Sequence, residues 1–268
     1  MSVNTAATPT VSRHVRGSSS FRGPLLAVAV GVVILVAWKA IIVLADLQPL
    51  VLPPPESVVA RFVRAWTDGT MWPHTSTTLI EVGLGFTAGA TAALFVGYLL
   101  ARSRLAAQAL SPYLVAAQAT PILALAPLIT IWFGIGLLSK VVICALIVFF
   151  PIAIATMVGI RSVDGQLIEL CRALRASRIQ IFTLVEIPAA LPAIFGGLRV
   201  GVTLSVVGAV IGEWIGSDKG LGVLINLAKG SLFDTPLLFA TLATLALLGS
   251  ALYLIVVIVE RRLVGVRG

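Results

Sequence analysis

Residue types that do chemistry in enzymes are scarce in this chain of 268 residues. It has two histidines, His14 and His74, and two cysteines, Cys144 and Cys171. Cys144 lies in an apolar run and Cys171 in a charged segment, which favours neither a disulfide nor a metal site. The patterns H-E-x-x-H, G-x-S-x-G and G-x-x-x-x-G-K-[ST] do not occur. We therefore expect no catalytic residue, metal site or cofactor, and we expect any ATP chemistry to reside on another chain.

The most distinctive charged segment is Arg161–Pro188, which is longer than a connection between two helices needs to be. Its apolar residues recur at helix spacing, whereas its arginines follow another face. These residues are Leu167, Leu170, Cys171 and Leu174 on the first face, and Arg172, Arg175 and Arg178 on the second. Ser177 and Gln180 fit a capping box, so a second short helix is predicted from Ser177, ending at Ile187-Pro188. Such a segment can dock a protein partner or lie against lipid headgroups.

The amino-acid composition indicates the class of protein to which this segment belongs. The chain is 59% hydrophobic and 11% charged, whereas soluble domains are about 45–50% apolar and about 25% charged. These values exclude a soluble globule and a disordered chain, and they indicate a polytopic membrane protein. The net charge of +8 does not indicate nucleic-acid binding, because the basic residues sit at the ends of apolar runs, as topology signals do.

The predicted fold is all-α, with about six transmembrane helices in the cell membrane. The predicted spans are Leu25–Ala45, Leu79–Leu100, Leu114–Phe133, Leu137–Ile160, Ala189–Ile215 and Leu237–Val259. Most arginines and lysines between them lie on the side of the N-terminus, which places both termini in the cytoplasm. Residues 1–23 are expected to form a polar cytoplasmic leader, and residues 24–268 the membrane domain, with the 161–188 loop in the cytoplasm.

Some residues within the spans are candidates for a substrate path. Glu213 lies near the outer end of the fifth span, where an ionisable side chain is either functional or locally paired. Pro121, Pro127 and Pro151 would free backbone carbonyls at membrane depth, which is tolerated where a helix lines protein or a watery cavity. We therefore expect spans three to five to line the substrate path. Gly85 and Gly89 form a G-x-x-x-G pair, which favours packing within the bundle over contact with a second copy.

The segment Glu169–Arg199, with the sequence ELCRALRASRIQIFTLVEIPAALPAIFGGLR, resembles the cytoplasmic EAA signature of ABC importer permeases. Glu169 matches its acidic residue, Ile187-Pro188 matches its ending, and Arg175 stands where the family usually has glycine. The segments TPILALAPLITIWFGIG, VLPPPESVVARF and EWIGSDKGLGVLI look like the nitrate/sulfonate/taurine branch of this family. At position 175, either the turn is built differently or the neighbouring helix continues through it.

The resemblance implies a translocation subunit that is not itself an enzyme. Its partners would be cytoplasmic ATP-binding subunits, a second permease copy that makes a homodimer, an outer solute-binding protein and membrane lipid. The residues that it assigns to the ATPase-coupling loop are Glu169, Arg172, Ala173, Arg175, Ser177, Gln180, Phe182 and Pro188. The substrates of this branch are nitrate, sulfonates, taurine or heterocyclic vitamins and their precursors, such as riboflavin and pyrimidines.

The alternative is a secondary transporter driven by an ion gradient. That class usually shows inverted repeats and coupling carboxylates at the bilayer midplane, and the sequence has no clear repeat and no central pair of acidic residues. Robust uptake without any ATPase would favour this alternative.

Overall fold

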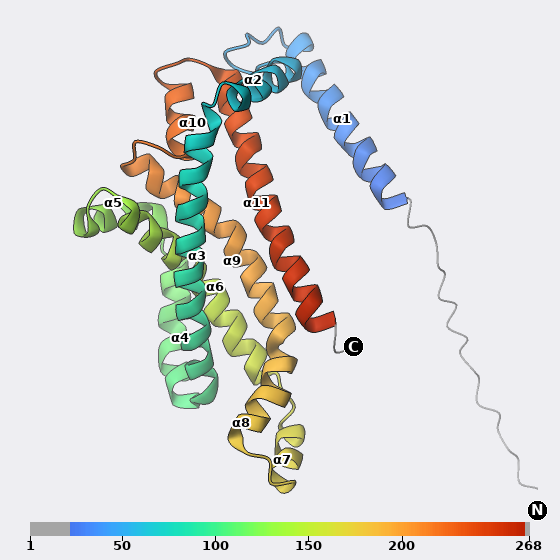
Figure 1. Ribbon diagram of the computed structural model, residues 1–268, viewed down its shortest axis with the longest axis vertical. Coiled ribbons are helices and arrows are strands. Elements are labelled where there is room, and N and C mark those ends of the chain that lie inside the picture. The colour runs from blue at the N-terminus through green and yellow to red at the C-terminus, as the bar shows by residue number, and fades with distance from the viewer. Residues whose placement is uncertain (1–21, 266–268) are drawn as a thin grey trace, which may run out of the picture. The chain divides into compact units, whose positions relative to one another are not determined.

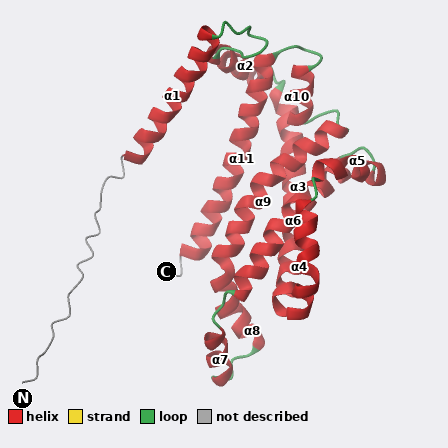
Figure 2. Ribbon diagram, turned by 180° about the vertical axis from the view of Figure 1, so that it is seen from behind, coloured by secondary structure: helices red, strands yellow, loops and turns green. Residues whose placement is uncertain are grey.

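The computed structural model describes residues 22–265, in which the regular elements are all helices (Figures 1 and 2). The chain divides into two compact units, residues 1–48 and 49–268. The described part of the first unit is α1 (Arg22–Leu44) and a short turn. Its helix is apolar almost throughout, which suits a lipid environment. The predicted leader falls outside the described residues, apart from its last two positions.

The second unit holds the remaining elements. They are α2 (Pro55–Thr67), α3 (Met71–Arg102), α4 (Arg104–Ala119), α5 (Ile122–Phe133), α6 (Leu137–Arg161), α7 (Gly165–Ala173), α8 (Arg178–Ile181), the π-helix η1 (Phe182–Glu186), α9 (Ile187–Ile215), α10 (Leu221–Lys229) and α11 (Thr235–Val264). Within this unit α6 packs between α3 and α9, and α11 packs against the other side of α9.

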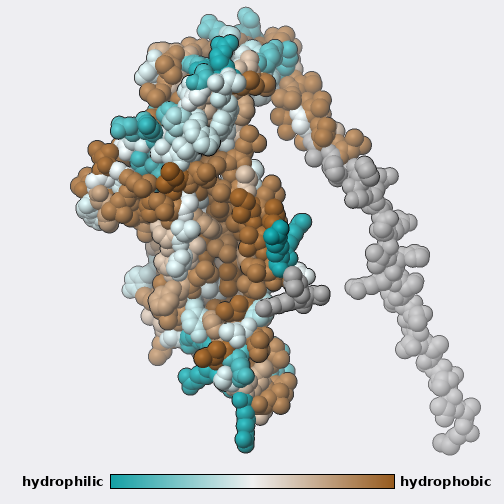
Figure 3. All heavy atoms as spheres, in the orientation of Figure 1, coloured by the Kyte–Doolittle hydropathy of each residue, from teal (hydrophilic) through white to brown (hydrophobic). Residues whose placement is uncertain are grey.

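Four helical stretches of the described chain are long and apolar enough to cross a membrane: α3, α6, α11, and the run Arg178–Ile215 that joins α8, η1 and α9. The visible face of these helices is mostly brown with pale patches, and hydrophilic side chains gather near α2 and near α7 and α8 (Figure 3). In α1 the apolar stretch Val28–Leu44 is a shorter helix. The all-α, polytopic architecture is therefore confirmed, whereas the count of six spans stays a prediction.

The third predicted span, Leu114–Phe133, is not a straight helix. Leu105–Ala119 and Ile122–Phe133 meet at an angle of 94°. The bend falls at Pro121, and Thr120 before it has φ −73° and ψ 127°. A residue that precedes proline is driven out of the helical region into this extended one, and proline itself cannot donate a backbone hydrogen bond. The segment is therefore a broken span or a re-entrant loop.

Glycines bring α3 and α6 into close contact. A Cβ atom on Gly89 would lie 2.6 Å from the Ala145 carbonyl oxygen, and one on Gly97 would lie 2.6 Å from that of Ala153. Gly85 abuts Cys144 in the same way. The predicted role of the G-x-x-x-G pair in packing within the bundle agrees with these contacts, because small residues let helix backbones approach closely.

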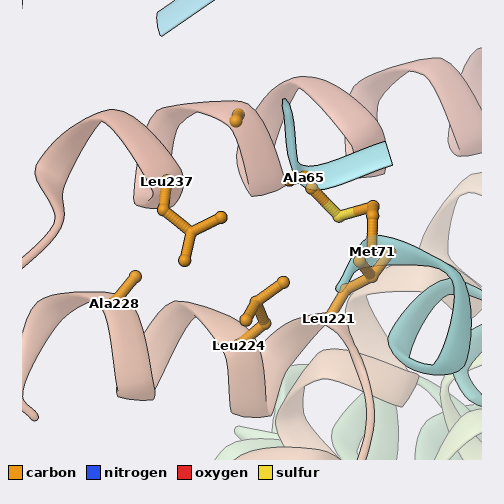
Figure 4. Packing of buried hydrophobic residues seen from close by; sticks show 7 residues of the cluster. Ala65, Met71, Leu221, Leu224, Ala228 and Leu237 are labelled. Atoms are coloured by element: carbon orange, nitrogen blue, oxygen red, sulfur yellow. The ribbon is translucent and has the colours of Figure 1, made fainter. Parts of the chain in front are cut away.

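A hydrophobic cluster holds α2, α10 and α11 to the start of α3. Met71, Leu221 and Leu237 are fully buried in it (Figure 4). Asp234 supports the cluster from its edge, because its carboxylate accepts a hydrogen bond from the Leu237 N–H (2.9 Å) and pairs with Arg61 of α2 (2.7 Å). We call this end of the α3–α6–α9 bundle the α10 end, and the end that carries α7 and α8 the loop end.

Candidate functional site

The 161–188 loop forms a preformed pair of short helices. Asp164 caps α7 by accepting a hydrogen bond from the Gln166 N–H at 2.8 Å. Along α7 and the turn after it, the side chains of Leu167, Leu170 and Leu174 are 43%, 56% and 74% exposed. A helix whose leucines face outward has not buried its apolar face within the described chain, which is typical of a surface that binds something else.

Arg175 ends α7 in a left-handed backbone conformation, with φ 60°. The N–H of Ala176 donates to the Cys171 carbonyl and the N–H of Arg175 donates to the Arg172 carbonyl, both at 2.9 Å. These two bonds make a Schellman motif, in which the left-handed position is usually glycine. The helix therefore ends at this position although an arginine occupies it.

The predicted capping box is confirmed. The Ser177 hydroxyl accepts a hydrogen bond from the Gln180 N–H (3.2 Å), and the Gln180 side chain accepts one from the Ser177 N–H (2.7 Å). The predicted end at Ile187-Pro188 is wrong, because the chain runs on through η1 into α9. Pro188 lies in the first turn of α9, where proline is well tolerated.

The residues that sequence reasoning assigned to this loop differ in exposure. Glu169, Arg172, Ala173, Arg175, Ser177 and Gln180 are exposed, whereas Phe182 and Pro188 are half-buried. No ion pair joins Arg172, Arg175 or Arg178 to a carboxylate in the described part of the chain. The loop therefore presents three positive charges beside its exposed leucines.

A cleft of about 910 Å³ separates this helix pair from the end of α3. Arg172 and Arg178 line it on the loop side, and Tyr98 and Arg102 line it on the α3 side. Glu186 lies at its wall and is only 2% exposed. The guanidinium groups of Arg172 and Arg178 therefore line the same cleft as the end of α3.

Arg102 and Glu186 form an ion pair that sequence reasoning did not find. The Arg102 guanidinium donates to Glu186 Oε1 at 2.9 Å and lies 2.7 Å from Oε2, a two-pronged contact. Nearby, Arg161 of α6 donates to the carbonyl oxygens of Leu100 (2.8 Å) and Ser103 (3.3 Å) at the end of α3. The loop end of α3 is therefore held both by α6 and by the segment that leads into α9.

A second buried polar cluster lies at the α10 end. Glu81 of α3 and Lys140 of α6 form an ion pair at 3.1 Å, with side chains 1% and 7% exposed. The Lys140 ammonium also donates to the Ser217 hydroxyl at 2.6 Å. Glu81 can be buried within the bundle because α6 supplies a cation beside it.

Glu213 is locally paired within the chain. Its carboxylate accepts hydrogen bonds from the Thr78 hydroxyl and from the Gly222 N–H, both at 2.5 Å. The Thr78 hydroxyl also accepts one from the Leu221 N–H at 2.9 Å. Glu213 thereby holds the start of α10 against α3 and the end of α9. These contacts give it a positioning role, and its predicted place on a substrate path stays a prediction.

The three prolines of the predicted path lie in different settings. Pro121 is exposed at the break between α4 and α5, and Pro127 is exposed within α5. Pro151 is half-buried within α6, where its carbonyl oxygen faces Gly197 of α9. Of the three, only Pro121 interrupts a helix. Their place on a substrate path stays a prediction.

Comparison with known proteins shows the family to which this architecture belongs. Residues 85–265 match the family described as binding-protein-dependent transport system inner membrane component. The chain is 46% identical over 255 residues to the riboflavin transport system permease protein RibX of Chloroflexus aurantiacus, covering 95% of both chains. It is 32% identical to the taurine transport system permease protein TauC of Escherichia coli, covering 86% of both.

A solved structure shares the fold. A chain of the MetNI methionine ABC transporter, in an inward facing conformation, superposes with a TM-score of 0.62 at 21% identity, over 69% of this chain and 92% of that one. Together with the apolar helices and the sequence relatives, this likeness agrees with a multi-pass location. The chain therefore belongs to the family of binding-protein-dependent transport system inner membrane components, and it is a permease of the ABC importer type.

Proposed function

We propose that this permease works with a separate cytoplasmic ATPase, which binds the 161–188 loop. The observation that carries the proposal is the preformed helix pair with exposed leucines and three arginines that have no carboxylate partner in the described chain. A partner surface with an apolar groove and acidic rim would complement it, and membership of the family supports an ATPase as that partner. In this arrangement the loop faces the cytoplasm.

In the proposed mechanism, ATP closes two ATPase subunits together, and each moves the loop of one permease copy. Glu169 and Arg172 contact the ATPase, and the Ser177–Phe182 segment transmits the movement to the membrane helices. A second copy of this chain completes the pathway as a homodimer, and an outer solute-binding protein delivers the substrate. The loop residues transmit force and carry out no covalent step.

We propose riboflavin, or a closely related heterocyclic vitamin, as the solute. The support is the 46% identity to the riboflavin permease over 95% of both chains. Taurine is the second candidate, since the taurine permease is 32% identical over 86% of this chain. Both solutes would reach the permease through a binding protein, so substrate choice also depends on that partner.

Uptake into vesicles tests the proposal. The permease would be purified with a candidate ABC-type ATPase from the same organism, reconstituted with a candidate solute-binding protein, and supplied with ATP inside and labelled riboflavin outside. We expect uptake that depends on ATP and is absent with a non-hydrolysable ATP analogue. We also expect the mass of the purified complex to correspond to two permease copies. Equal uptake without the ATPase, driven by an imposed ion gradient, would favour a secondary transporter. ATP-dependent uptake of taurine but not riboflavin would overturn the substrate assignment alone.

A further inference from the structure

We infer that Arg102 and Glu186 are positioning residues that carry the movement of the 161–188 loop directly to α3. The inference rests on the proposed function, because it assumes that an ATPase moves the loop. Along the backbone the loop connects to α6 on one side and to α9 on the other. A movement of the loop therefore reaches α3 only through noncovalent contacts. Among the described residues this pair is the ion pair that joins the loop to α3, and it lies beside the hydrogen bonds that Arg161 donates to the end of α3.

The geometry of the pair suits the transmission of force. Nη1 of Arg102 donates a hydrogen bond to Glu186 Oε1 at 2.9 Å, and Nη2 lies 2.7 Å from Oε2 as an ion-pair contact that does not form a second hydrogen bond. The charge-assisted hydrogen bond and the close second contact hold the two groups in one orientation as well as at one distance. The Glu186 side chain is 3% exposed, whereas the Arg102 side chain is 42% exposed, so the carboxylate is shielded from water and the guanidinium reaches it from the cleft.

Aromatic packing reinforces the same connection. The Arg102 guanidinium lies 5.2 Å from the centre of the Tyr98 ring, and its Nε donates to the Tyr98 hydroxyl at 3.0 Å. Tyr98 in turn meets the ring of Phe182 edge-on, with centroids 5.0 Å apart. Tyr98 and Arg102 belong to the last turns of α3, whereas Phe182 and Glu186 are the first and last residues of η1. Both ends of the π-helix are thus attached to α3.

The position of the π-helix explains why such an attachment is useful. A π-helical turn is a rare interruption of an α-helix, and such turns often lie at functional sites. η1 is the segment through which the loop's helices continue into α9. Without an external attachment, movement of α7 and α8 could be absorbed by deformation of η1. The pair attaches η1 to α3, so that α3 and α9 move together when the loop moves.

The test compares transport with ATP hydrolysis in the reconstituted complex. Arg102→Met alone leaves a buried carboxylate unpaired and can disturb folding, so the main variant is Arg102→Met with Glu186→Gln. We expect this double variant to assemble with the ATPase and to unfold at the wild-type temperature. We expect the number of solute molecules taken up per ATP hydrolysed to fall by about tenfold, since residues that couple two sites typically change that coupling by factors of this order. The charge swap Arg102→Glu with Glu186→Arg should restore part of the ratio.

Arg262→Met is the matched control, because Arg262 is an exposed arginine near the end of α11. It should leave the ratio unchanged. A double variant that keeps the wild-type ratio would overturn the inference, and so would one that loses assembly and thermal stability in the same proportion as uptake. Absence of ATP-driven uptake by the wild-type complex would instead refute the proposed function, and the inference would fall with it.

Discussion

Arg175 adopts a left-handed conformation that costs a residue with a Cβ atom about 1–2 kcal/mol. Its N–H is also needed for the bond to the Arg172 carbonyl. Proline at 175 would remove that N–H and impose a negative φ, so we expect Arg175→Pro to open the end of α7. Hydrogen–deuterium exchange of residues 165–176 should accelerate by about tenfold or more, since each 1.4 kcal/mol corresponds to one factor of ten.

Arg178→Pro is the control for that substitution. Arg178 is the first residue of α8, and Ser177 before it is extended, with φ −70° and ψ 159°. The first position of a helix tolerates proline, and an extended residue before it is the conformation that proline favours, so both features suit proline at position 178. The two variants remove the same charge from the same loop, so equal acceleration in both would contradict the assignment of the Schellman motif.

Lys140 forms a buried ion pair with Glu81 at 3.1 Å. Replacing only one partner of a buried ion pair costs about 3–5 kcal/mol, because the other charge stays buried without compensation. We therefore expect Lys140→Met to lower the unfolding temperature in detergent clearly. Glu81→Gln combined with Lys140→Met should recover much of that loss, and a double variant no more stable than Lys140→Met would contradict the pairing.

The residue-scale features differ in how far the sequence could predict them. The capping box of Ser177 and Gln180 spans four residues, so its pattern is visible in the sequence, and the prediction is confirmed. The departure from glycine at Arg175 is visible too, but the conformation is not, because the cost of a left-handed arginine is small enough for two hydrogen bonds to offset. The Arg102–Glu186 pair joins residues 84 positions apart, and only the packing of α3 against α9 makes them neighbours.

Among the helices, the contact of α3 with α6 depends on glycine. A Cβ atom on Gly89 would meet the backbone of α6, which cannot move aside as a flexible side chain can. Gly83 lies nearly two turns earlier on the exposed side of the same helix, where an added Cβ atom would meet open space. We expect Gly89→Ala to destabilise the protein by a few kcal/mol, of the order seen for overpacked cores, in thermal unfolding of the purified permease.

Gly83→Ala is the comparison within the same helix. It should be neutral or stabilising by up to about 1 kcal/mol, because alanine is the better helix former. If Gly83→Ala were the more damaging variant, and dissociated the two permease copies, then the G-x-x-x-G helix would use its other face at a subunit interface.

Proline position explains why the third predicted span is not one straight helix. The helices contain Pro112, Pro127, Pro151 and Pro192 without an interruption. Pro121 differs because its predecessor Thr120 is extended and Pro121 itself stands at the start of the next helix. A proline in an apolar run therefore indicates that a break is possible, and the surrounding packing decides whether the chain kinks, continues or turns by 94°.

At the scale of the whole bundle, polar contacts concentrate at its two ends and glycine contacts lie between them. Glu81, Lys140 and Glu213 fasten the α10 end, and Arg102, Arg161 and Glu186 fasten the loop end. Separating one partner from a buried ion pair leaves the other charge uncompensated, so each of these contacts disfavours other arrangements of the helices that it joins. Such a bundle resists internal deformation, so a displacement applied at the loop end is expected to reach the α10 end through α3, α6 and α9 together.

The direction of this bundle in the membrane can be measured with the chain's own cysteines. Cys171 is half-buried on α7 and Cys144 is fully buried in α6, so a maleimide reagent should modify Cys171 alone. If the 161–188 loop faces the cytoplasm, a membrane-impermeant maleimide added to intact cells should leave Cys171 unmodified and should modify it after permeabilisation.

Ser231→Cys, placed in a Cys171→Ser background, reports on the connection between α10 and α11 at the opposite end. It should react in intact cells. Modification of Cys171 in intact cells would reverse the orientation and remove the proposed ATPase from reach of its loop.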